Sequence, residues 1–165
     1  MGAVLYEVGF QFEPGLVIML LVTIGFPIIL AFRWRDLPVL PRCFFSIACI
    51  FLFVVSIFVF TFHFDMYRAA INAYRSGQYE IVEGYVENFD PLSKEEKGSE
   101  SFEINGVRFF YSDTKIITGY HNTKKNGGVI TGNGQYLKIG YIYYNDSYGN
   151  IIVYIEELDI PPKMQ

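Results

Sequence analysis

Few residues in this chain have the types and spacing that support chemistry. Only two histidines and two cysteines occur among the 165 residues, so metal ligands and strong nucleophiles are scarce. His63 and Asp65 close a long apolar run, where a histidine and a carboxylate can form a metal or proton site. The end of a membrane helix is also where polar side chains reach water, and we favour that interpretation. The sequence therefore predicts no metal and no cofactor.

A glycine-rich segment, residues 113–134, contains the second histidine. Its stretch GYHNTKKNGG places His121 near Lys124 and Lys125, which can hold an anion together with backbone amides. The stretch lacks the second glycine and the Ser/Thr of a phosphate-binding loop, so a solvated loop is the preferred interpretation. Five glycines among these 22 residues predict a long irregular connection.

The carboxylates form no recognisable catalytic pair. The four glutamates between residues 95 and 103 lack the spacing of a calcium-binding loop. Glu156 and Glu157 are adjacent in a predicted strand, so their side chains point to opposite faces. No nucleophile elbow occurs among the serines and threonines. An enzyme is therefore the weaker class of function for this chain.

Two long apolar runs, residues 15–32 and 43–64, dominate the first part of the chain. As helices of 18 and 22 residues they measure about 27 and 33 Å, close to a hydrocarbon thickness of roughly 30 Å. The second run contains both cysteines, Cys43 and Cys49, which are about 240° apart on a helix and cannot pair with each other. The sequence predicts an α-helical transmembrane hairpin in residues 1–64, with the lipid bilayer as its partner.

The connection between the two runs indicates their orientation. Residues 33–42 contain three arginines and the tryptophan Trp34, whereas residues 1–14 contain no lysine or arginine. Positive charge in a short loop marks the cytoplasmic side of a membrane. We therefore expect an integral protein of a bacterial inner membrane, with both termini and everything after the second run outside the cytoplasm.

We expect a juxtamembrane helical stalk over residues 65–77 and a mainly-β domain over residues 78–165. Alanines favour continuation of the helix, and Gly77 can supply the left-handed residue that ends it. Residues 79–89 then alternate as a strand, and residues 90–99 form a charged loop. Residues 136–144 and 151–158 predict a second hairpin.

The turn Asn105-Gly106 is the clearest local signal in the β domain. This dipeptide favours a type I′ turn, which pairs Ile104 with Val107 and places Glu103 opposite Arg108. Five strands from about 80 residues cannot form an open sheet with two good faces, so we expect a small five-stranded OB- or SH3-like barrel.

The stretch ESFEINGVRFFYSD, residues 100–113, resembles a module of uncharacterised bacterial membrane proteins. The resemblance extends to the strand IVEGYVENF, the glycine-rich GGVITG and a final Ile-x-Tyr strand. It covers roughly residues 70–157. It implies a bacterial origin and membrane helices followed by a small β-barrel, and it implies no activity.

These observations favour a membrane-anchored, extracytoplasmic binding or assembly module whose partner is another membrane or envelope protein. Immunity against a membrane-acting toxin is an alternative, and an enzyme at the junction of barrel and membrane ranks lower. From residue 66 onward, 10 basic residues mix with 13 acidic ones, so nucleic acid is not expected as a partner. Two polar loops, residues 90–99 and 114–134, are the expected contact sites. Their candidate residues are Lys94, Tyr120, His121, Lys124 and Lys125.

Overall fold

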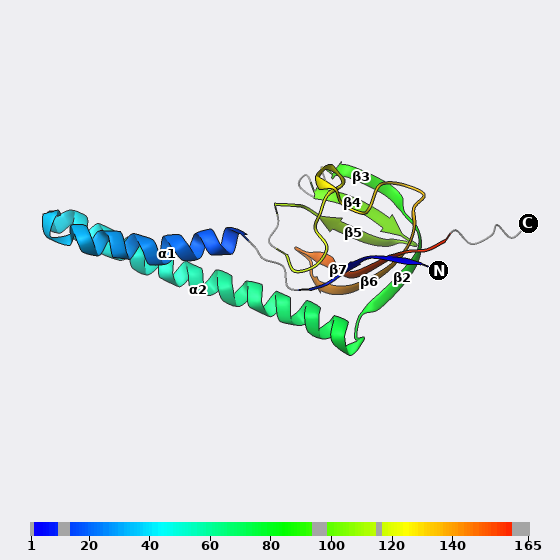
Figure 1. Cartoon of the computed structure of the whole chain (residues 1–165), viewed down its shortest axis with the longest axis horizontal. Helices are drawn as coiled ribbons and strands as arrows, with labels where there is room; N and C mark the ends of the chain where they lie inside the picture. The colour runs from blue at the N-terminus through cyan, green and yellow to red at the C-terminus, as the bar shows by residue number, and fades with distance from the viewer. Residues whose placement is uncertain (1, 10–13, 94–98, 115–116, 160–165) are drawn as a thin grey trace, which may run out of the picture. The chain divides into compact units, whose positions relative to one another are not determined.

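A computed structural model of the chain describes residues 2–9, 14–93, 99–114 and 117–159 (Figure 1). The chain forms two compact units. One unit is Gln11–Asp65, which we call the helical unit. The other combines Met1–Phe10 with Met66–Gln165, and we call it the β unit.

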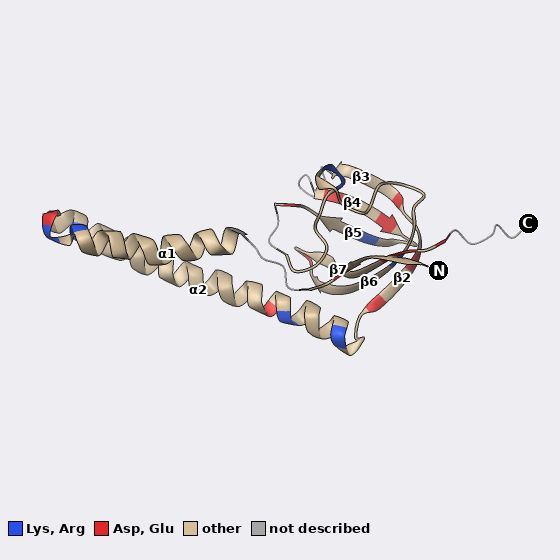
Figure 2. Cartoon of the chain, viewed as in Figure 1, with Lys and Arg blue, Asp and Glu red and all other residues tan. Residues whose placement is uncertain are grey.

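The helical unit contains two helices that are long and apolar enough to cross a membrane. Helix α1 spans Pro14–Arg33, the short 3-10 helix η1 spans Trp34–Asp36, and helix α2 begins at Val39 and ends at Ser76. In the most apolar stretch of each helix, 0% and 6% of the residues are buried, so these stretches present their apolar side chains at the surface. Figure 2 shows that charged residues on these helices lie at their connection and in the last turns of α2.

Polar contacts hold the connection and the middle of the helix pair. The guanidinium of Arg42 donates to the carbonyl of Leu37 at 2.7 Å and lies 5.8 Å from the centre of the Trp34 ring. Farther along the pair, the hydroxyls of Thr23 and Ser56 are hydrogen-bonded at 2.6 Å. Such hydroxyl bonds between helices are typical of packing in an apolar medium.

Helix α2 continues through the segment predicted as a stalk. It ends at Ser76, and Gly77 follows with a φ of 68°, the left-handed conformation expected after a helix end. These last turns belong to the β unit, where Ala70 and Ile71 are buried together with Val153. The segment is therefore part of a packed domain, and its apolar face covers part of the sheet.

The β unit is built from two antiparallel sheets. The first has the strand order β1-β7-β6-β2, and the second has the order β3-β4-β5. Aromatic and aliphatic side chains from both sheets form one core, in which the rings of Phe109 and Tyr141 meet edge to face at 5.3 Å. The strands are β1 (Ala3–Glu7), β2 (Glu80–Tyr85), β3 (Glu87–Ser93), β4 (Ser99–Ile104), β5 (Val107–Tyr111), β6 (Tyr136–Asn145) and β7 (Gly149–Glu157).

The predicted five-stranded barrel is wrong, because the two sheets do not close and seven strands are described. One additional strand is β1, in a segment predicted as an N-terminal tail, which pairs antiparallel with β7. The other arises because the strand predicted at residues 79–89 is divided. Val86 separates β2 from β3, and Asn88 has a φ of 50°. The chain thereby passes from one sheet to the other, as at the corner of a sandwich (Figure 1).

Both predicted hairpins are confirmed. Asn105 and Gly106 have φ values of 48° and 80°, and the register pairs Ile104 with Val107 and Glu103 with Arg108. Strands β6 and β7 form the second hairpin. Of the charged loop predicted at residues 90–99, the first four residues belong to β3 and Ser99 begins β4, so the prediction is wrong there. The rest of that prediction lies outside the described residues.

Candidate functional site

The long connection between β5 and β6 is the most distinctive part of the β unit. Within the described part of this connection, the only helical turn is η2, Lys124–Asn126. The described part of the connection is nevertheless held closely to the β unit, because Ile117 and Ile130 are buried in the core. The amide of Tyr120 donates to the carbonyl of Ile152 at 3.0 Å, and the amide of Gly134 donates to the carbonyl of Val86 at 2.9 Å. We call residues 113–134 the anchored loop.

A buried carboxylate holds the middle of the anchored loop. Glu100, on β4, is 1% exposed. Its side chain accepts a hydrogen bond from the hydroxyl of Tyr111 and another from the backbone amide of Lys124, at 2.9 Å. Burial raises the pKa of Glu100, and these two hydrogen bonds oppose that rise. Burial, reinforced by the neighbouring carboxylate, also raises the pKa of the Tyr111 hydroxyl. Glu100 thus ties strand β4 to the first residue of η2.

A second carboxylate closes the base of the same loop. Asp113 accepts hydrogen bonds from the backbone amide of Thr123 at 2.9 Å, from the Thr123 hydroxyl, and from the side-chain amide of Asn126 at 2.8 Å. Partial burial acts to raise the pKa of Asp113, but the three donors prevail and lower it. The charged form of Asp113 therefore organises the turn that contains η2.

Tyr120, one of the predicted contact residues, is a core residue. It is 2% exposed, its ring meets the Tyr111 ring edge to face at 5.1 Å, and its hydroxyl accepts the amide of Val129 at 2.6 Å. Burial raises the pKa of Tyr120 to about 12. Residue 128 must be small, because a Cβ at Gly128 would lie only 2.6 Å from the Tyr120 hydroxyl. The side chain of Tyr120 packs in the core beneath the anchored loop, so it is not available to a partner.

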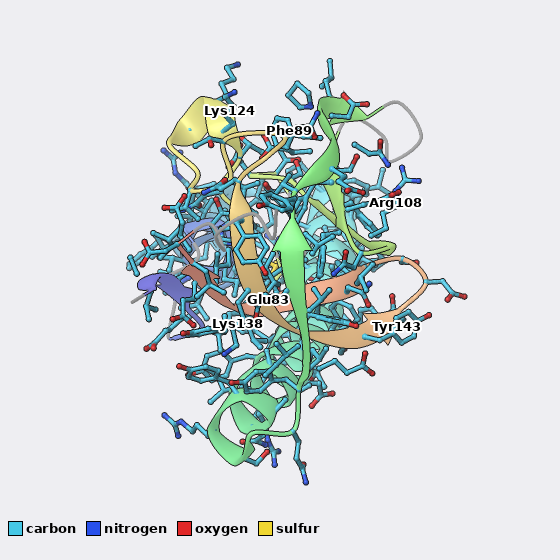
Figure 3. The ribbon with its side chains drawn as sticks, turned by 90° about the vertical axis from the view of Figure 1, so that its right-hand side faces the viewer. Glu83, Phe89, Arg108, Lys124, Lys138 and Tyr143 are labelled. Atoms are coloured by element: carbon cyan, nitrogen blue, oxygen red, sulfur yellow. The ribbon has the colours of Figure 1, made fainter. Side chains whose placement is uncertain are left out.

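The two predicted lysines of the anchored loop lie at its surface. Both Lys124 and Lys125 are exposed and belong to η2. The ammonium of Lys124 lies 5.6 Å from the centre of the Phe89 ring on β3, and Figure 3 shows the two side chains together at the edge of the β unit. The amide of Phe89 in turn donates to the side chain of Asn133 at 2.8 Å. The lysines are thus carried by a backbone fixed on both sides.

The remaining predicted residues are placed differently. His121 is half-buried, and its Nδ1 lies 2.9 Å from the carbonyl of Gly119. A carbonyl can only accept, so Nδ1 of His121 is the donor in this hydrogen bond. His63 and Asp65 lie two positions apart on α2, a spacing that does not bring side chains together. Lys94 lies outside the described residues.

Glu100 and Asp113 are the residues that sequence reasoning missed. A signal for the first was present, because strand alternation places Glu100 on the same face as Phe102 and Ile104. The hairpin register also sets it directly opposite Tyr111. No comparable signal marked Asp113, whose partners Thr123 and Asn126 are brought to it only by the path of the loop.

The carboxylate at the centre of the site is closed off from solvent. A general acid or base must come within hydrogen-bond reach of its substrate, and Glu100 is enclosed by the loop that it anchors. Among the described residues, no group of three histidine, cysteine, aspartate or glutamate side chains is placed to hold a metal ion. The exposed side chains of the site include those of Lys124 and Lys125, and also those of Asp113 and Asn126.

Comparison with known proteins adds no relative to this picture. The chain matches no family model, and no curated protein or solved structure is significantly similar to it.

Proposed function

We propose that this chain is a membrane-anchored binding module, which contacts another membrane or envelope protein through the anchored loop. The observation that carries the proposal is the double anchoring of that loop by Glu100 and Asp113, which places Lys124 and Lys125 at fixed surface positions. Recognition residues are commonly borne on loops that a rigid scaffold positions. Fixing the loop before binding lowers the entropy that association costs.

The membrane part of the proposal is supported by the pairing of the first and last strands. Strand β1 precedes α1, its partner β7 follows α2, and both strands belong to the β unit. The segments on either side of the helix pair therefore emerge on the same side of any membrane. Two crossings satisfy this condition, and one crossing does not.

The orientation follows from the connection between the helices. Arg33, Arg35 and Arg42 cluster there, so we place the connection in the cytoplasm and the β unit outside it. The partner would then be a protein of the bacterial envelope. The two exposed lysines favour an acidic surface on that partner, because complementary charge speeds association and selects against basic surfaces.

Site-specific photo-crosslinking in intact cells tests this proposal. A photoreactive residue at Lys125 is expected to give a discrete adduct with a second protein. The matched control is Ser147, which is also exposed but lies in the turn between β6 and β7. Identical adducts from both positions, or none from Lys125, would contradict the proposal.

A charge variant tests the nature of the partner surface. Lys125→Glu, made in a chain with the photoreactive residue at Lys124, is expected to reduce the yield of the adduct severalfold. Lys125→Arg keeps the charge and should retain the yield. An adduct unaffected by Lys125→Glu would rule out the acidic surface while leaving the contact itself in place.

A further inference from the structure

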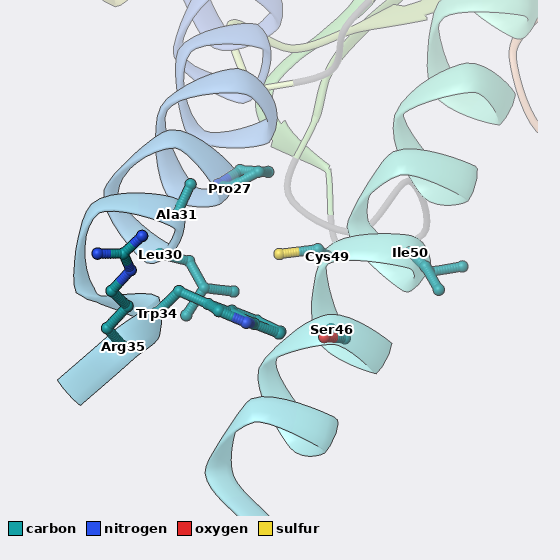
Figure 4. A pocket seen from close by; sticks show the side chains of 8 residues that line it. All are labelled: Pro27, Leu30, Ala31, Trp34, Arg35, Ser46, Cys49 and Ile50. Atoms are coloured by element: carbon teal, nitrogen blue, oxygen red, sulfur yellow. The ribbon is translucent and has the colours of Figure 1, made fainter. Parts of the chain in front are cut away.

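The helical unit contains an open groove of about 540 Å³ between its two helices (Figure 4). This volume lies within the range of roughly 300–1,000 Å³ typical of ligand sites. Its walls come from α1, η1 and α2, and they are mostly apolar. The residues that matter here are Pro27, Leu30, Trp34, Arg35, Ser46 and Cys49.

The groove combines an apolar floor with a charged end. Figure 4 shows the Trp34 indole and the Cys49 thiol directed into the space between the helices, with Leu30 between them. Arg35 follows Trp34 in η1 and also lines the groove. Tryptophan and arginine in this arrangement are typical of the level of lipid headgroups.

The charge at this end of the groove is in excess and is not neutralised locally. The connection contains Arg33, Arg35 and Arg42 but one acidic residue, Asp36. Arg42 is engaged by backbone carbonyls and by the Trp34 ring. Within the described part of the chain, no carboxylate contacts the guanidinium of Arg35.

We propose that this groove is a binding site for one anionic phospholipid, with an acyl chain between the helices and the phosphate on Arg35. A basic pocket between membrane helices is a form of site that binds anionic headgroups, and a guanidinium matches a phosphate in geometry. The proposal rests on the membrane placement argued above. It does not depend on what the β unit binds.

A second hollow on α2 provides an internal comparison. It measures about 520 Å³ and is lined by apolar residues and Cys43, with no charged side chain among them. Acyl chains can cover it as they cover any lipid-facing surface. It offers nothing to distinguish an anionic lipid from a zwitterionic one.

Trp34, the chain's single tryptophan, serves as a built-in reporter for the groove. The full-length protein is reconstituted into vesicles of phosphatidylcholine and phosphatidylglycerol, and one of the two lipids at a time has brominated acyl chains, which quench tryptophan fluorescence. We expect brominated phosphatidylglycerol to reach half-maximal quenching at an about fivefold lower mole fraction than brominated phosphatidylcholine. This preference corresponds to the attraction of about one basic residue to an anionic membrane surface.

Two variants with the same change in charge separate a site from general attraction. Arg35→Gln is expected to abolish the preference for the anionic lipid. Arg33→Gln removes a neighbouring arginine that does not line the groove, and it should retain most of the preference. Equal quenching by both brominated lipids in the unmodified chain, or equal losses in the two variants, would overturn the proposal.

Two further measurements test whether the chain binds membranes at all and whether a second copy of the chain fills the groove. Flotation of the reconstituted protein with vesicles is done first, because a chain that does not float contradicts the membrane placement as well. Oxidation of a Cys43→Ser variant then reports a second copy in the groove. Disulfide-linked dimers through Cys49, together with quenching that falls as the protein-to-lipid ratio rises, would assign the groove to a second copy and overturn the lipid proposal.

Discussion

The carboxylate of Glu100 accepts a hydrogen bond from the hydroxyl of Tyr111, and both side chains are buried in the core of the β unit. They are direct neighbours across strands β4 and β5. A buried carboxylate is costly unless it is hydrogen-bonded, and here its second donor is the backbone of the anchored loop. The pair therefore links the stability of the β unit to the position of the loop.

The raised pKa of Glu100 predicts how stability depends on pH. The ordinary value is 4.5, and burial lifts the folded-state pKa above it. Between these two pKa values the folded protein holds a proton that the unfolded chain has already released. The contribution of Glu100 to the unfolding free energy is therefore fully present below pH 4.5 and is lost as pH rises through the folded-state pKa. We expect the difference in unfolding free energy between the unmodified chain and Glu100→Gln to shrink over that interval. Urea denaturation followed by near-UV circular dichroism of the tyrosines measures it.

The matched control for this prediction is Glu103→Gln. Glu103 lies on the same strand but on the opposite face, across from Arg108. This variant should keep the loss of stability with rising pH that the unmodified chain has. A Glu100→Gln variant with the same pH profile as the unmodified chain would show that the carboxyl is not desolvated.

Removal of the charge on Asp113 should loosen the base of the anchored loop. Asp113→Asn keeps the size of the side chain but replaces one accepting oxygen with a donor, facing the Thr123 and Asn126 donors. We expect a loss of about 1 kcal/mol in unfolding free energy, as for a typical hydrogen bond at an exposed site. Hydrogen exchange should quicken at the amide of Thr123. Unchanged exchange there would contradict the assigned role.

The turn at Asn105 and Gly106 should resist β-branched residues. Gly106 has a φ of 80° and open space around it, so only the backbone conformation limits what fits. We expect Gly106→Val to cost about 1 to 3 kcal/mol, because a β-branched residue strongly disfavours positive φ. Gly106→Asn is the control, since asparagine tolerates this conformation. Equal melting temperatures for the two variants would contradict the turn.

Reporter fusions test the orientation of the helix pair. Alkaline phosphatase, which is active only outside the cytoplasm, is expected to be active when fused after the end of β7. Green fluorescent protein inserted between Asp36 and Val39, in the connection, is expected to fluoresce. An inactive phosphatase together with a non-fluorescent insertion would reverse the orientation.

Local signals in the sequence were sufficient for some of these elements and insufficient for others. Apolar length predicted both helices, and the Asn105-Gly106 turn predicted its hairpin, because each signal lies within the element that it specifies. The prediction of a barrel was wrong because the deciding signals do not lie within the strands that they affect. Strand β1 joins the sheet only through β7, which lies far from it in the sequence. The break between β2 and β3 lies at Val86, and Asn88, two residues later, has a positive φ that no turn motif in the sequence announces.

The candidate site divides in the same way. Lys124 and Lys125 were visible as a charged pair within a glycine-rich stretch, whereas the burial of Tyr120 was not, because polar neighbours surround it in the sequence. Its burial depends on contacts with Ile152 and Tyr111, which belong to other strands. Long-range packing thus decides which residues of a loop are exposed.

The pairing of β1 with β7 also sets the order in which the chain can fold. Both helices and five other strands lie between these two partners in the sequence. During synthesis β1 has no pairing strand until β7 is made. Contacts between residues that are far apart in the sequence slow folding. Until then, the unpaired strand is prone to associate with strands of other chains. The β unit can therefore be completed only after β7 has left the ribosome, although β1 is made before both helices.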